Sequence, residues 1–490
     1  MTPVILRGDC VTHLQSMPEA SVDAIVCDPP YGLEFMGKEW DKLGGDRRQR
    51  GDASYKQGDA RRGLVRHGGT ASYGVDPSQA GLAMQESHAA WAAEAFRVLK
   101  PGGHLLAFGG SRTYHRLACA IEDVGFEIRD SIVWMYGQGF PKSLDVSKAI
   151  DKAAGAERAV VGVHTTGRRA TPKNDIRGGQ FASATEEHID LSAITAPATD
   201  DARTWDGWGT ALKPGMEPIV VARKPLAART VAANVVKHGT GALNIDGCRI
   251  GLDGGTSRGA DGSNAGKPRN VLHGGNFGVI ALNAGRWPAN VVLSHVPDDF
   301  DADGNEVFGC RALGTATEAQ PVWECAPGCP VAALDAQSGV TKSQGGRAVD
   351  QFRDCNPVYG GGRGLEEARD PGFGDEGGAS RFFYQSKATN RERWGYCHDC
   401  SVVFNRGDKI ARGTHKPHRV EYHPTVKPVD LMRWLVRLVT PPGGLVVDPF
   451  CGTGTTGEAA CLEGFRFIGM EREPTYARIA AHRLNDLEIP

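Results

Sequence analysis

Apolar residues near the N-terminus alternate between short continuous runs and helical spacing. The runs Val4–Leu6, Val22–Cys27 and His104–Phe108 have the length and composition of buried strands. Between the second and third runs, from Gln79 to Leu99, apolar residues recur at the spacing of one helix face. This alternation of strand and helix is typical of an α/β fold.

The first half of the chain contains further elements of the same kind. The pattern predicts a helix over Arg116–Val124 and a strand over Ile128–Met135. Another strand is predicted over Glu217–Ala222, isolated by Lys-Pro-Gly before it and Arg-Lys-Pro after it. We expect this isolated strand to return to the main sheet.

The same rhythm resumes at the other end of the chain. An apolar face over residues 428–439 predicts a helix, which the sequence Pro-Pro-Gly-Gly then ends. A strand over Leu445–Asp448, a helix over Thr455–Glu463, a strand over Phe465–Met470 and a helix over Pro474–Leu484 follow. The C-terminal part therefore predicts a βαβα unit.

Between the two ends, the chain has a different texture. Glycine accounts for 65 of the 490 residues, about twice its usual share, and most of this excess lies in the middle. Residues 227–420 contain many Gly-Gly pairs and no sustained alternation. We therefore expect three parts: residues 1–226 and 421–490, which build one α/β domain, and residues 227–420, which form a loop-rich insertion.

Composition and charge narrow the class of protein without identifying it. Lys and Arg number 56 against 58 for Asp and Glu, so a nucleic-acid surface would have to be local. No apolar run is long enough to span a membrane, and the N-terminus lacks the features of a secretory signal. The sequence predicts a cytoplasmic protein with no membrane partner.

A glycine-rich motif, Asp448-Pro-Phe-Cys-Gly-Thr-Gly-Thr-Thr-Gly457, directly follows an apolar strand and opens a helix. We call it the glycine loop. Glycines there allow a tight turn and close approach of a ligand to the helix N-terminus. Glu471 ends the next strand, where a carboxylate can accept hydrogen bonds from ribose hydroxyls. The alternative is a tight turn with a surface glutamate, and the missing Gly-Lys-Ser/Thr disfavours a phosphate loop.

A second motif, Asp28-Pro29-Pro30-Tyr31, follows the buried strand Val22–Cys27. We call it the DPPY loop. Its prolines fix an extended turn at the carboxyl end of a strand, where ligands bind in open α/β sheets. Asp28 and the Pro29 carbonyl can accept the two N–H groups of an amine on a heteroaromatic ring, while Tyr31 stacks on that ring. The alternative is a rigid turn with a capping aspartate.

Together, these two motifs resemble those of the amino-directed DNA methyltransferases, which modify adenine N6 or cytosine N4. The order here, with the DPPY loop first and the glycine loop last, resembles the permuted form of that family. The resemblance implies a Rossmann-like S-adenosylmethionine-dependent methyltransferase sheet, with residues 227–420 as target-recognition region. It also implies methyl transfer from S-adenosyl-L-methionine to a base flipped out of double-stranded DNA.

The resemblance also implies a set of site residues. The catalytic residues would be Asp28, Pro29, Pro30 and Tyr31. The cofactor-binding residues would be Asp9, Lys427, Asp448, Phe450, Gly452, Gly454, Thr455 and Glu471. Lys427 lies in a segment, His423–Pro428, that resembles the one bordering the methionine end of the cofactor in this family.

The acceptor base and the partners follow less directly. Asp at the first position of the DPPY loop is more usual for adenine-N6 enzymes and Ser for cytosine-N4 enzymes, so the sequence favours adenine. Cytosine-C5 methylation needs a nucleophilic cysteine after proline, and the chain has no Pro-Cys dipeptide. Cytosine-N4 methylation, an RNA or protein acceptor, and a non-catalytic zinc-stabilised DNA-binding protein stay open. So do a cognate restriction endonuclease and a homodimer.

Four cysteines have the spacing of metal ligands. Cys397 and Cys400 are followed by His415 and His418, which predicts a structural zinc site with two cysteines and two histidines. A competing pairing combines Cys397 and Cys400 with the Cys325–Cys329 pair. That second pair can instead be a turn with two buried thiols.

Overall fold

The structure, a computed structural model, describes residues 3–31, 77–136, 143–163, 193–250 and 425–487, together with shorter segments between residues 269 and 423. Its centre is a nine-stranded sheet. In sheet order, the strands are β1 (Val4–Arg7), β22 (Arg466–Glu471), β21 (Leu445–Asp448), β2 (Val22–Cys27), β3 (Leu99–Phe108), β7 (Met216–Arg223), β4 (Glu127–Tyr136), β10 (Val291–Ser294) and β17 (Tyr384–Ser386).

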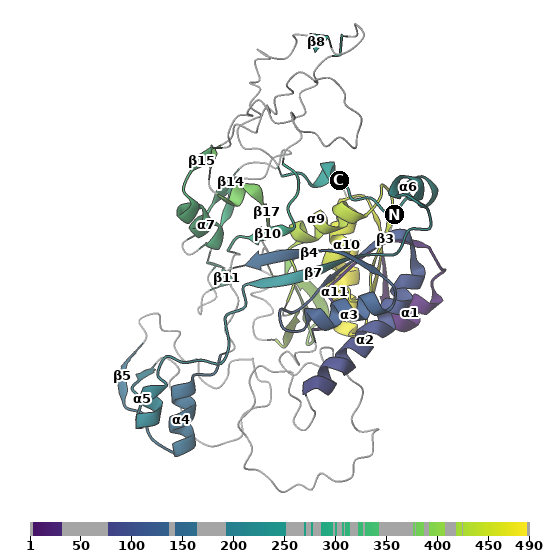
Figure 1. The fold of residues 1–490 in the computed structure, drawn as a ribbon. Coiled ribbons are helices and arrows are strands. Elements are labelled where there is room, and N and C mark those ends of the chain that lie inside the picture. Colours follow the sequence, from purple (N-terminus) through teal and green to yellow (C-terminus); the bar gives the residue numbers. More distant parts are fainter. Residues whose placement is uncertain are drawn as a thin grey trace, which may run out of the picture.

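Strands from the two ends of the chain interleave in this sheet. The N-terminal strand β1 pairs with β22, and β21 pairs with β2, all in parallel. Strand β7 runs antiparallel to both β3 and β4, while the other paired strands of the sheet run parallel (Figure 1). The expected α/β architecture is confirmed, including the adjacency of strands from both ends and the return of β7 to the sheet.

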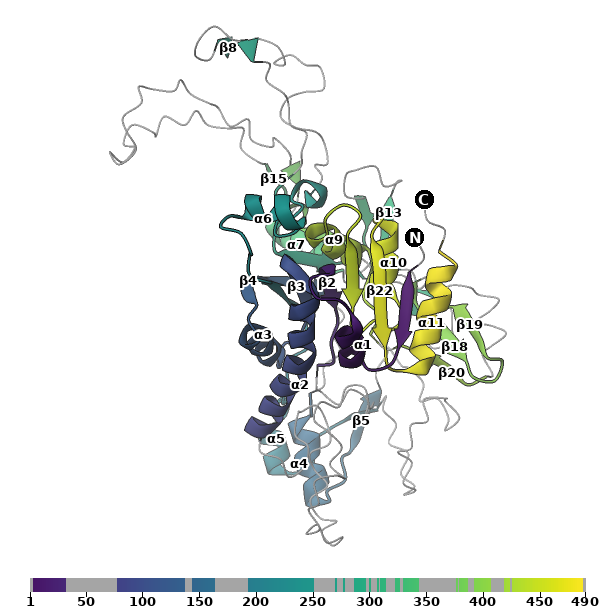
Figure 2. The same ribbon diagram turned by 90° about the vertical axis from the view of Figure 1, so that its right-hand side faces the viewer.

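Helices cover both faces of the sheet. Helices α1 (Cys10–Ser16), α2 (Pro77–Val98) and α3 (Tyr114–Asp123) pack on one face, where Ile25 and Cys27 of β2 point. Helices α9 (Val429–Val439) and α10 (Thr455–Leu462) pack on the other face, against Ala24 and Val26 (Figure 2). Because β2 is buried on both faces, all its residues except Asp23 are apolar.

One predicted boundary is wrong. The helix pattern was expected to run to Leu99 and the next strand to start at His104, after Pro101-Gly102-Gly103. In the structure, β3 begins at Leu99, directly after α2. The backbone of Gly102 and Gly103 pairs with Lys224 at the end of β7, which holds this segment extended. Gly102 has a φ of +81°, and a Cβ there would lie 2.5 Å from the side chain of Asn234, so only glycine fits.

The segment 227–420 is more closely tied to the sheet than its texture suggested. Strand β10 extends the sheet in parallel from β4, and β17 pairs in parallel with β10. Each has only three or four residues, too few to stand out in a glycine-rich context. The insertion thus contributes two strands to the main sheet, while its role in target recognition stays a prediction.

Smaller units surround this core (Figures 1 and 2). Helix α11 (Pro474–Asn485) packs against a three-stranded sheet of β18 (Trp394–Cys397), β19 (Val402–Asn405) and β20 (Val420–Tyr422). The remaining elements are α4 (Val146–Ala154), β5 (Val160–Val163), β6 (Ala193–Thr195), α5 (Asp200–Thr204), α6 (Val231–His238), η3 (Asp246–Cys248), β8 (Arg269–Asn270), β9 (Asn276–Phe277), β11 (Asp299–Phe300), β12 (Glu306–Val307), β13 (Arg311–Leu313), β14 (Val322–Glu324), α7 (Pro330–Ser338), β15 (Thr341–Lys342), β16 (Glu376–Gly377) and η5 (Ala379–Phe382). Among the described residues, no helix is both long and apolar enough to cross a membrane.

A buried carboxylate joins neighbouring strands at the amino end of the sheet. Asp23 of β2 is 3% exposed. Its Oδ1 lies 2.6 Å from Lys100 Nζ of β3, and its Oδ2 accepts a hydrogen bond of 2.7 Å from the Leu445 N–H of β21. Arg466 of β22 approaches the same carboxylate at 3.7 Å. Asp23 therefore fastens the two ends of the chain to each other.

We expect Asp23→Ala to lower the free energy of unfolding by about 2–3 kcal/mol, because it leaves a backbone N–H and an ammonium without their charged acceptor. Urea denaturation measures this change. A matched control is Arg129→Ala, whose ion pair with Glu127 at 3.8 Å is exposed and should contribute less than about 1 kcal/mol. Equal losses in the two variants would contradict the role of Asp23.

Candidate active site

A cavity of about 690 Å³ lies where the carboxyl ends of the central strands meet. The DPPY loop follows β2 and the glycine loop follows β21, and these two strands are neighbours in the sheet. Both loops line the cavity, together with Glu471 at the end of β22 and Glu217 near the start of the antiparallel strand β7. The two motifs, about 400 residues apart in sequence, thus face one space.

Asp28 and Tyr31 of the DPPY loop form a compact charged cluster with Glu217 and Lys427, which we call the DPPY cluster. Lys427 Nζ lies 2.5 Å from Asp28 Oδ2 and 3.2 Å from Glu217 Oε2. The Tyr31 hydroxyl lies 2.8 Å from Asp28 Oδ1 and 2.9 Å from Glu217 Oε2, within hydrogen-bond distance of both carboxylates. Two carboxylates and one ammonium leave this cluster with a net negative charge when all three are ionised.

Burial and charge act in opposite directions on Lys427. Its side chain is 7% exposed, and burial alone would lower its pKa, but the carboxylates of Asp28 and Glu217 outweigh this and raise the pKa above its ordinary value. Burial also raises the pKa of Tyr31 well above its ordinary value, and the same two carboxylates raise it further. Lys427 is therefore charged and Tyr31 neutral at physiological pH.

Aromatic rings form the wall behind this cluster. Lys427 Nζ lies 4.9 Å from the centroid of the Phe108 ring. Trp134 and Tyr136 of β4 lie with their ring centroids 4.9 Å apart, and the Tyr136 hydroxyl lies 3.2 Å from Glu217 Oε1. Because Trp134 and Tyr136 line the cavity beside Tyr31, the space next to Asp28 suits a planar ring.

The glycine loop is held by two carboxylates. Asp448 Oδ1 accepts a hydrogen bond from the Phe450 N–H at 2.9 Å, and its Oδ2 accepts one from the Thr456 hydroxyl at 2.6 Å. Glu471 Oε2 accepts a hydrogen bond from the Gly452 N–H at 2.8 Å. Gly454 has a φ of +86°, which allows α10 to begin immediately after the turn.

These two carboxyl groups have unusual acidity. Burial raises the pKa of Asp448 to about 7, opposed by its hydrogen bonds from Thr456 and Phe450. Burial likewise raises the pKa of Glu471 to about 7, opposed by the backbone N–H groups of Glu473 and Gly452. Each backbone N–H uses one acceptor position on a different oxygen of Glu471, so each oxygen of an ionised Glu471 keeps a further lone pair.

The structure places most predicted residues around the one cavity. The described residues named for it on sequence grounds and found in its lining are Asp9, Asp28, Pro29, Pro30, Tyr31, Lys427, Asp448, Phe450, Gly452, Thr455 and Glu471. Gly454 is not part of that lining, although the residues on either side of it are, and it packs against Ala480. The ammonium of Lys427 contacts Asp28 and Glu217, and its part in cofactor binding stays a prediction.

Glu217 and Tyr136 were not predicted as site residues. Glu217 is the first residue of the strand predicted over Glu217–Ala222, but that prediction rested on the apolar residues after it. Tyr136 ends a strand and carries no motif, so its position in the cavity follows only from the pairing of β4 with β7.

The predicted zinc ligands are partly brought together. Cys397 Sγ and Cys400 Sγ lie 3.4 Å and 3.2 Å from His418 Nδ1. His415, the fourth predicted ligand, lies outside the described residues. The competing pairing with Cys325 and Cys329 is wrong, because those two thiols gather around a different histidine.

The fold and the cavity together define an α/β protein with a cavity between a glycine loop and an acidic strand end. The DNA methylase family matches residues 22–153 and 375–482, which together make up about half of the chain and contain both motifs. The chain belongs to this family, the amino-directed DNA methyltransferases of the adenine-N6 and cytosine-N4 type.

Individual relatives match only in part. The type II methyltransferase M.HindIII of Haemophilus influenzae is 27% identical over 254 residues, covering 50% of this chain and 65% of that protein. The putative methylase YubD of Escherichia coli is 34% identical over 97 residues, covering 18% of this chain and 43% of that protein. The chain thus spans about half to two thirds of the length of these curated relatives.

Solved structures of similar proteins superpose loosely. PvuII DNA methyltransferase (cytosine-N4-specific) gives a TM-score of 0.39 at 12% identity, covering 99% of this chain and 89% of that one. A DNA modification methylase of Thermus thermophilus, complexed with S-adenosyl-L-methionine, gives 0.35 at 14% identity, covering 98% and 93%.

The raised pKa of Glu471 predicts that the free energy of unfolding falls as the pH rises. Its pKa rises from an ordinary 4.5 to about 7, so its contribution to stability is fully present below the unfolded pKa and is lost as the pH rises through about 7. Relative to Glu471→Gln, the unaltered protein should lose about 1 kcal/mol of unfolding free energy between pH values of about 6 and 8. Denaturation at both pH values measures this difference, and a difference that stays constant would contradict it.

Proposed function

We propose that this protein is a site-specific DNA methyltransferase that transfers a methyl group from S-adenosyl-L-methionine to N6 of adenine. The observation that carries this proposal is the position of Asp28, on the same cavity as the glycine loop and Glu471. An acceptor group at Asp28 and a nucleoside at Glu471 would share one enclosed space, as direct transfer between them requires.

The residues around the glycine loop fit the proposed cofactor. Glu471 keeps acceptor positions for ribose hydroxyls, and Gly452, which lines the cavity, leaves room above the backbone for a ligand. The missing side chain of Gly454 instead lets Ala480 of α11 approach the glycine loop. Asp9 and Phe450 line the same region, and the Phe450 ring stands edge-on to Trp91 at 5.3 Å, which fixes its orientation. When bound, S-adenosylmethionine would supply a methyl group activated by a positively charged sulfur.

Asp28 would hold the acceptor amine. Tyr31 and Lys427 each occupy one position on a different oxygen of the Asp28 carboxylate, so each oxygen keeps a lone pair for an N–H of the amine. The Lys427 ammonium lies 2.5 Å from this carboxylate and balances its charge, and the Pro29 carbonyl would accept the second N–H. Both hydrogen bonds direct the nitrogen lone pair away from the ring plane.

The charge of the DPPY cluster favours the transfer. The amine nitrogen attacks the methyl carbon as the carbon–sulfur bond breaks, and the amine becomes positively charged until it releases one proton. The net negative charge of Asp28, Glu217 and Lys427 stabilises this developing positive charge. No proton has to leave before attack.

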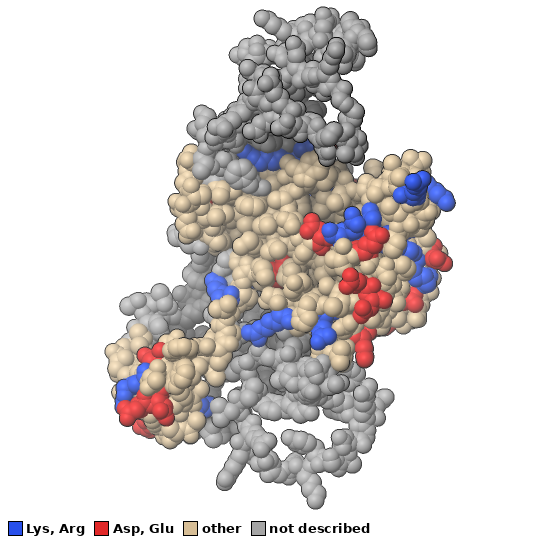
Figure 3. All heavy atoms as spheres, in the orientation of Figure 1, with Lys and Arg blue, Asp and Glu red and all other residues tan. Residues whose placement is uncertain are grey.

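Duplex DNA is the proposed substrate, with the target base flipped into the cavity beside Tyr31, Trp134 and Tyr136. On the face drawn in Figure 3, the described Lys and Arg residues are interspersed with Asp and Glu and form no continuous basic patch. Phosphate contacts are proposed for residues 38–66, a segment rich in Lys and Arg that lies outside the described residues. Target recognition is assigned to residues 227–420.

Cytosine N4 is the second candidate acceptor. The relatives include a cytosine-N4-specific enzyme by name, and the same amine chemistry serves both bases. Asp rather than Ser at position 28 favours adenine. A cognate restriction endonuclease and a homodimer belong to the same proposal, since amino-directed methylation commonly serves to protect DNA from such an endonuclease.

A structural zinc ion at Cys397, Cys400 and His418 is also part of the proposal, with His415 as the fourth ligand. Cys397 ends β18, Cys400 lies in the turn to β19, and His418 precedes β20. An ion there would fix the three-stranded sheet that packs on α11, without taking part in methyl transfer.

The test of the function is transfer of labelled methyl from S-adenosylmethionine to mixed-sequence duplex DNA, followed by nucleoside analysis of the digest. We expect N6-methyladenine, because Asp28 and the Pro29 carbonyl present the acceptors that an amine needs and Asp rather than Ser at position 28 favours adenine. N4-methylcytosine would overturn the base assignment but keep the mechanism. Cofactor binding without label in DNA would favour an RNA or protein acceptor, or a non-catalytic DNA-binding protein.

Asp28→Ala should reduce methyl transfer by at least about 10²–10³-fold, since it removes one of the two acceptors that orient the amine. Cofactor affinity, measured by calorimetry, should stay unchanged because Glu471 and the glycine loop are intact. The matched control is Asp123→Ala, an exposed carboxylate outside the cavity that should transfer at the normal rate. Full activity in the Asp28 variant would refute the assignment.

A further inference from the structure

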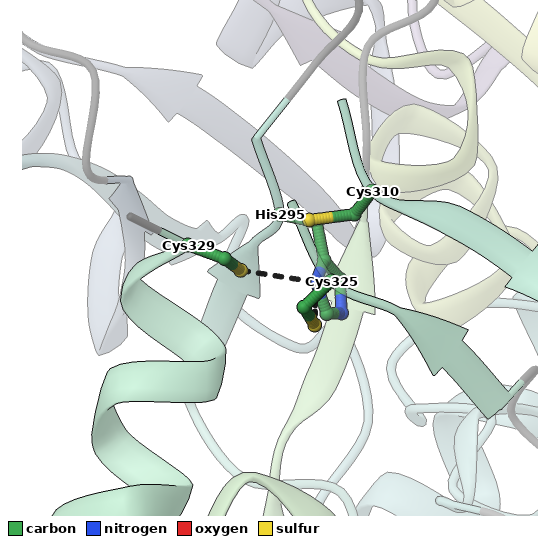
Figure 4. A group of neighbouring side chains, drawn as sticks. All are labelled: His295, Cys310, Cys325 and Cys329. Atoms are coloured by element: carbon green, nitrogen blue, oxygen red, sulfur yellow. Dashed lines mark hydrogen bonds between the residues drawn. The ribbon is translucent and has the colours of Figure 1, made fainter. Parts of the chain in front are cut away.

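Outside the cavity, four soft metal-ligating side chains converge in the insertion. His295, Cys310, Cys325 and Cys329 present their ligand atoms within 4.8 Å of one another (Figure 4). Cys329 Sγ lies 3.4 Å and Cys325 Sγ 3.6 Å from His295 Nδ1. We propose that these four residues bind one zinc ion as a closed, structural Cys₃His site.

The distances suit a single ion. Tetrahedral zinc, with bonds of about 2.3 Å to sulfur and about 2.0 Å to nitrogen, separates sulfur from nitrogen by about 3.6 Å and sulfur from sulfur by about 3.8 Å. The two sulfur–nitrogen distances observed agree with this edge length. A cluster of several iron atoms would need its ligands farther apart. With four protein ligands, the site has no open position for a substrate.

The histidine is prepared for metal binding. Its Nε2 lies 2.7 Å from Gln385 Oε1 of β17, an acceptor that places the proton on Nε2 and leaves the Nδ1 lone pair for the ion. Trp323 stacks on the imidazole with centroids 4.1 Å apart and an interplanar angle of 25°. The ring is therefore fixed in both tautomer and orientation before any metal arrives.

The thiols are likewise arranged for ligation. Cys310 and Cys325 flank the paired strands β13 and β14, and Cys329 is the N-cap residue of α7, where the helix dipole favours a thiolate. The Ala326 N–H donates a hydrogen bond of 3.3 Å to Cys310 Sγ. All three are free thiols, and His295, Cys310 and Cys329 are at most 2% exposed.

A metal ion would reinforce a small apolar cluster. Besides the two buried cysteines, the cluster contains Leu293 and Val331 as its buried members, and the other hydrophobic side chains packed against it are only partly buried. A zinc ion would add folding energy there. It would fasten β13, β14 and α7 to the end of β10, and so to the main sheet.

Zinc content of the full-length protein, purified under reducing conditions, tests the proposal. The double variant Cys397→Ser/Cys400→Ser removes the other candidate site, and this background should still carry about one zinc ion per chain. Adding Cys325→Ser, the most exposed of the three thiols, should abolish it. Adding Cys119→Ser instead, an exposed free cysteine outside both clusters, should leave it bound.

A second series guards against loss of metal through misfolding. On the same background, His295→Ala should lose the ion, whereas His295→Cys should retain it with four thiolates. Cobalt substitution distinguishes the Cys₃His site from the Cys₄ site of His295→Cys, because the intensity of the thiolate charge-transfer band should grow by about one third from three thiolates to four. In the unaltered site, a mercurial thiol reagent should release one zinc as three thiols react.

Two results would overturn the inference. One is a zinc content that Cys325→Ser and His295→Ala leave unchanged. The other is a disulfide between two of Cys310, Cys325 and Cys329, detected by mass mapping of protein purified without reductant, in a chain that carries no zinc at this position. Methylation activity does not enter either readout, so the proposed function and this site can fail separately.

Discussion

The contact between Lys427 and Asp28 joins residues 399 positions apart in the sequence, and the rest of the cavity depends on it. The Lys427 ammonium balances the charge of the Asp28 and Glu217 carboxylates, which would otherwise repel each other at the carboxyl ends of the central strands. It also brings the segment before α9 against the DPPY loop. Without this ammonium, a cavity with Asp28, Glu217, Asp448 and Glu471 on its walls would concentrate negative charge in a partly dry space.

The same arrangement divides the chemistry between the chain ends. Strand β2 leads into the DPPY loop with Asp28. Strand β21 leads into the glycine loop, and β22 ends at Glu471. Parallel pairing of these strands places all their carboxyl ends on one edge, so ligands bound to each loop meet. Asp23 locks the opposite edge of the same strands, which keeps the two halves in register.

The sequence predicted the outer parts of the fold well, because long, strongly patterned elements carry their own signal. Strands β2 and β21 were predicted from apolar runs, and most of the residues predicted from the motifs that follow them line the cavity. Strands β10 and β17 were missed, since three or four residues cannot show a period. Cys310 and His295 were missed for a related reason: each is a single residue whose partners lie on other segments, and only the folded chain brings them together.

The membership of β10 and β17 in the central sheet has a consequence for protein engineering. Recognition regions of DNA-modifying enzymes invite exchange between relatives, with cuts made where the sequence pattern changes. Cutting this chain at residues 227 and 420 would remove β10, which pairs with β4. Strand β4 would then become an exposed edge strand that can pair with other chains. A chimaera that keeps residues 291–294 and 384–386 with the host sheet, and replaces only the loops between them, respects the hydrogen-bonded framework.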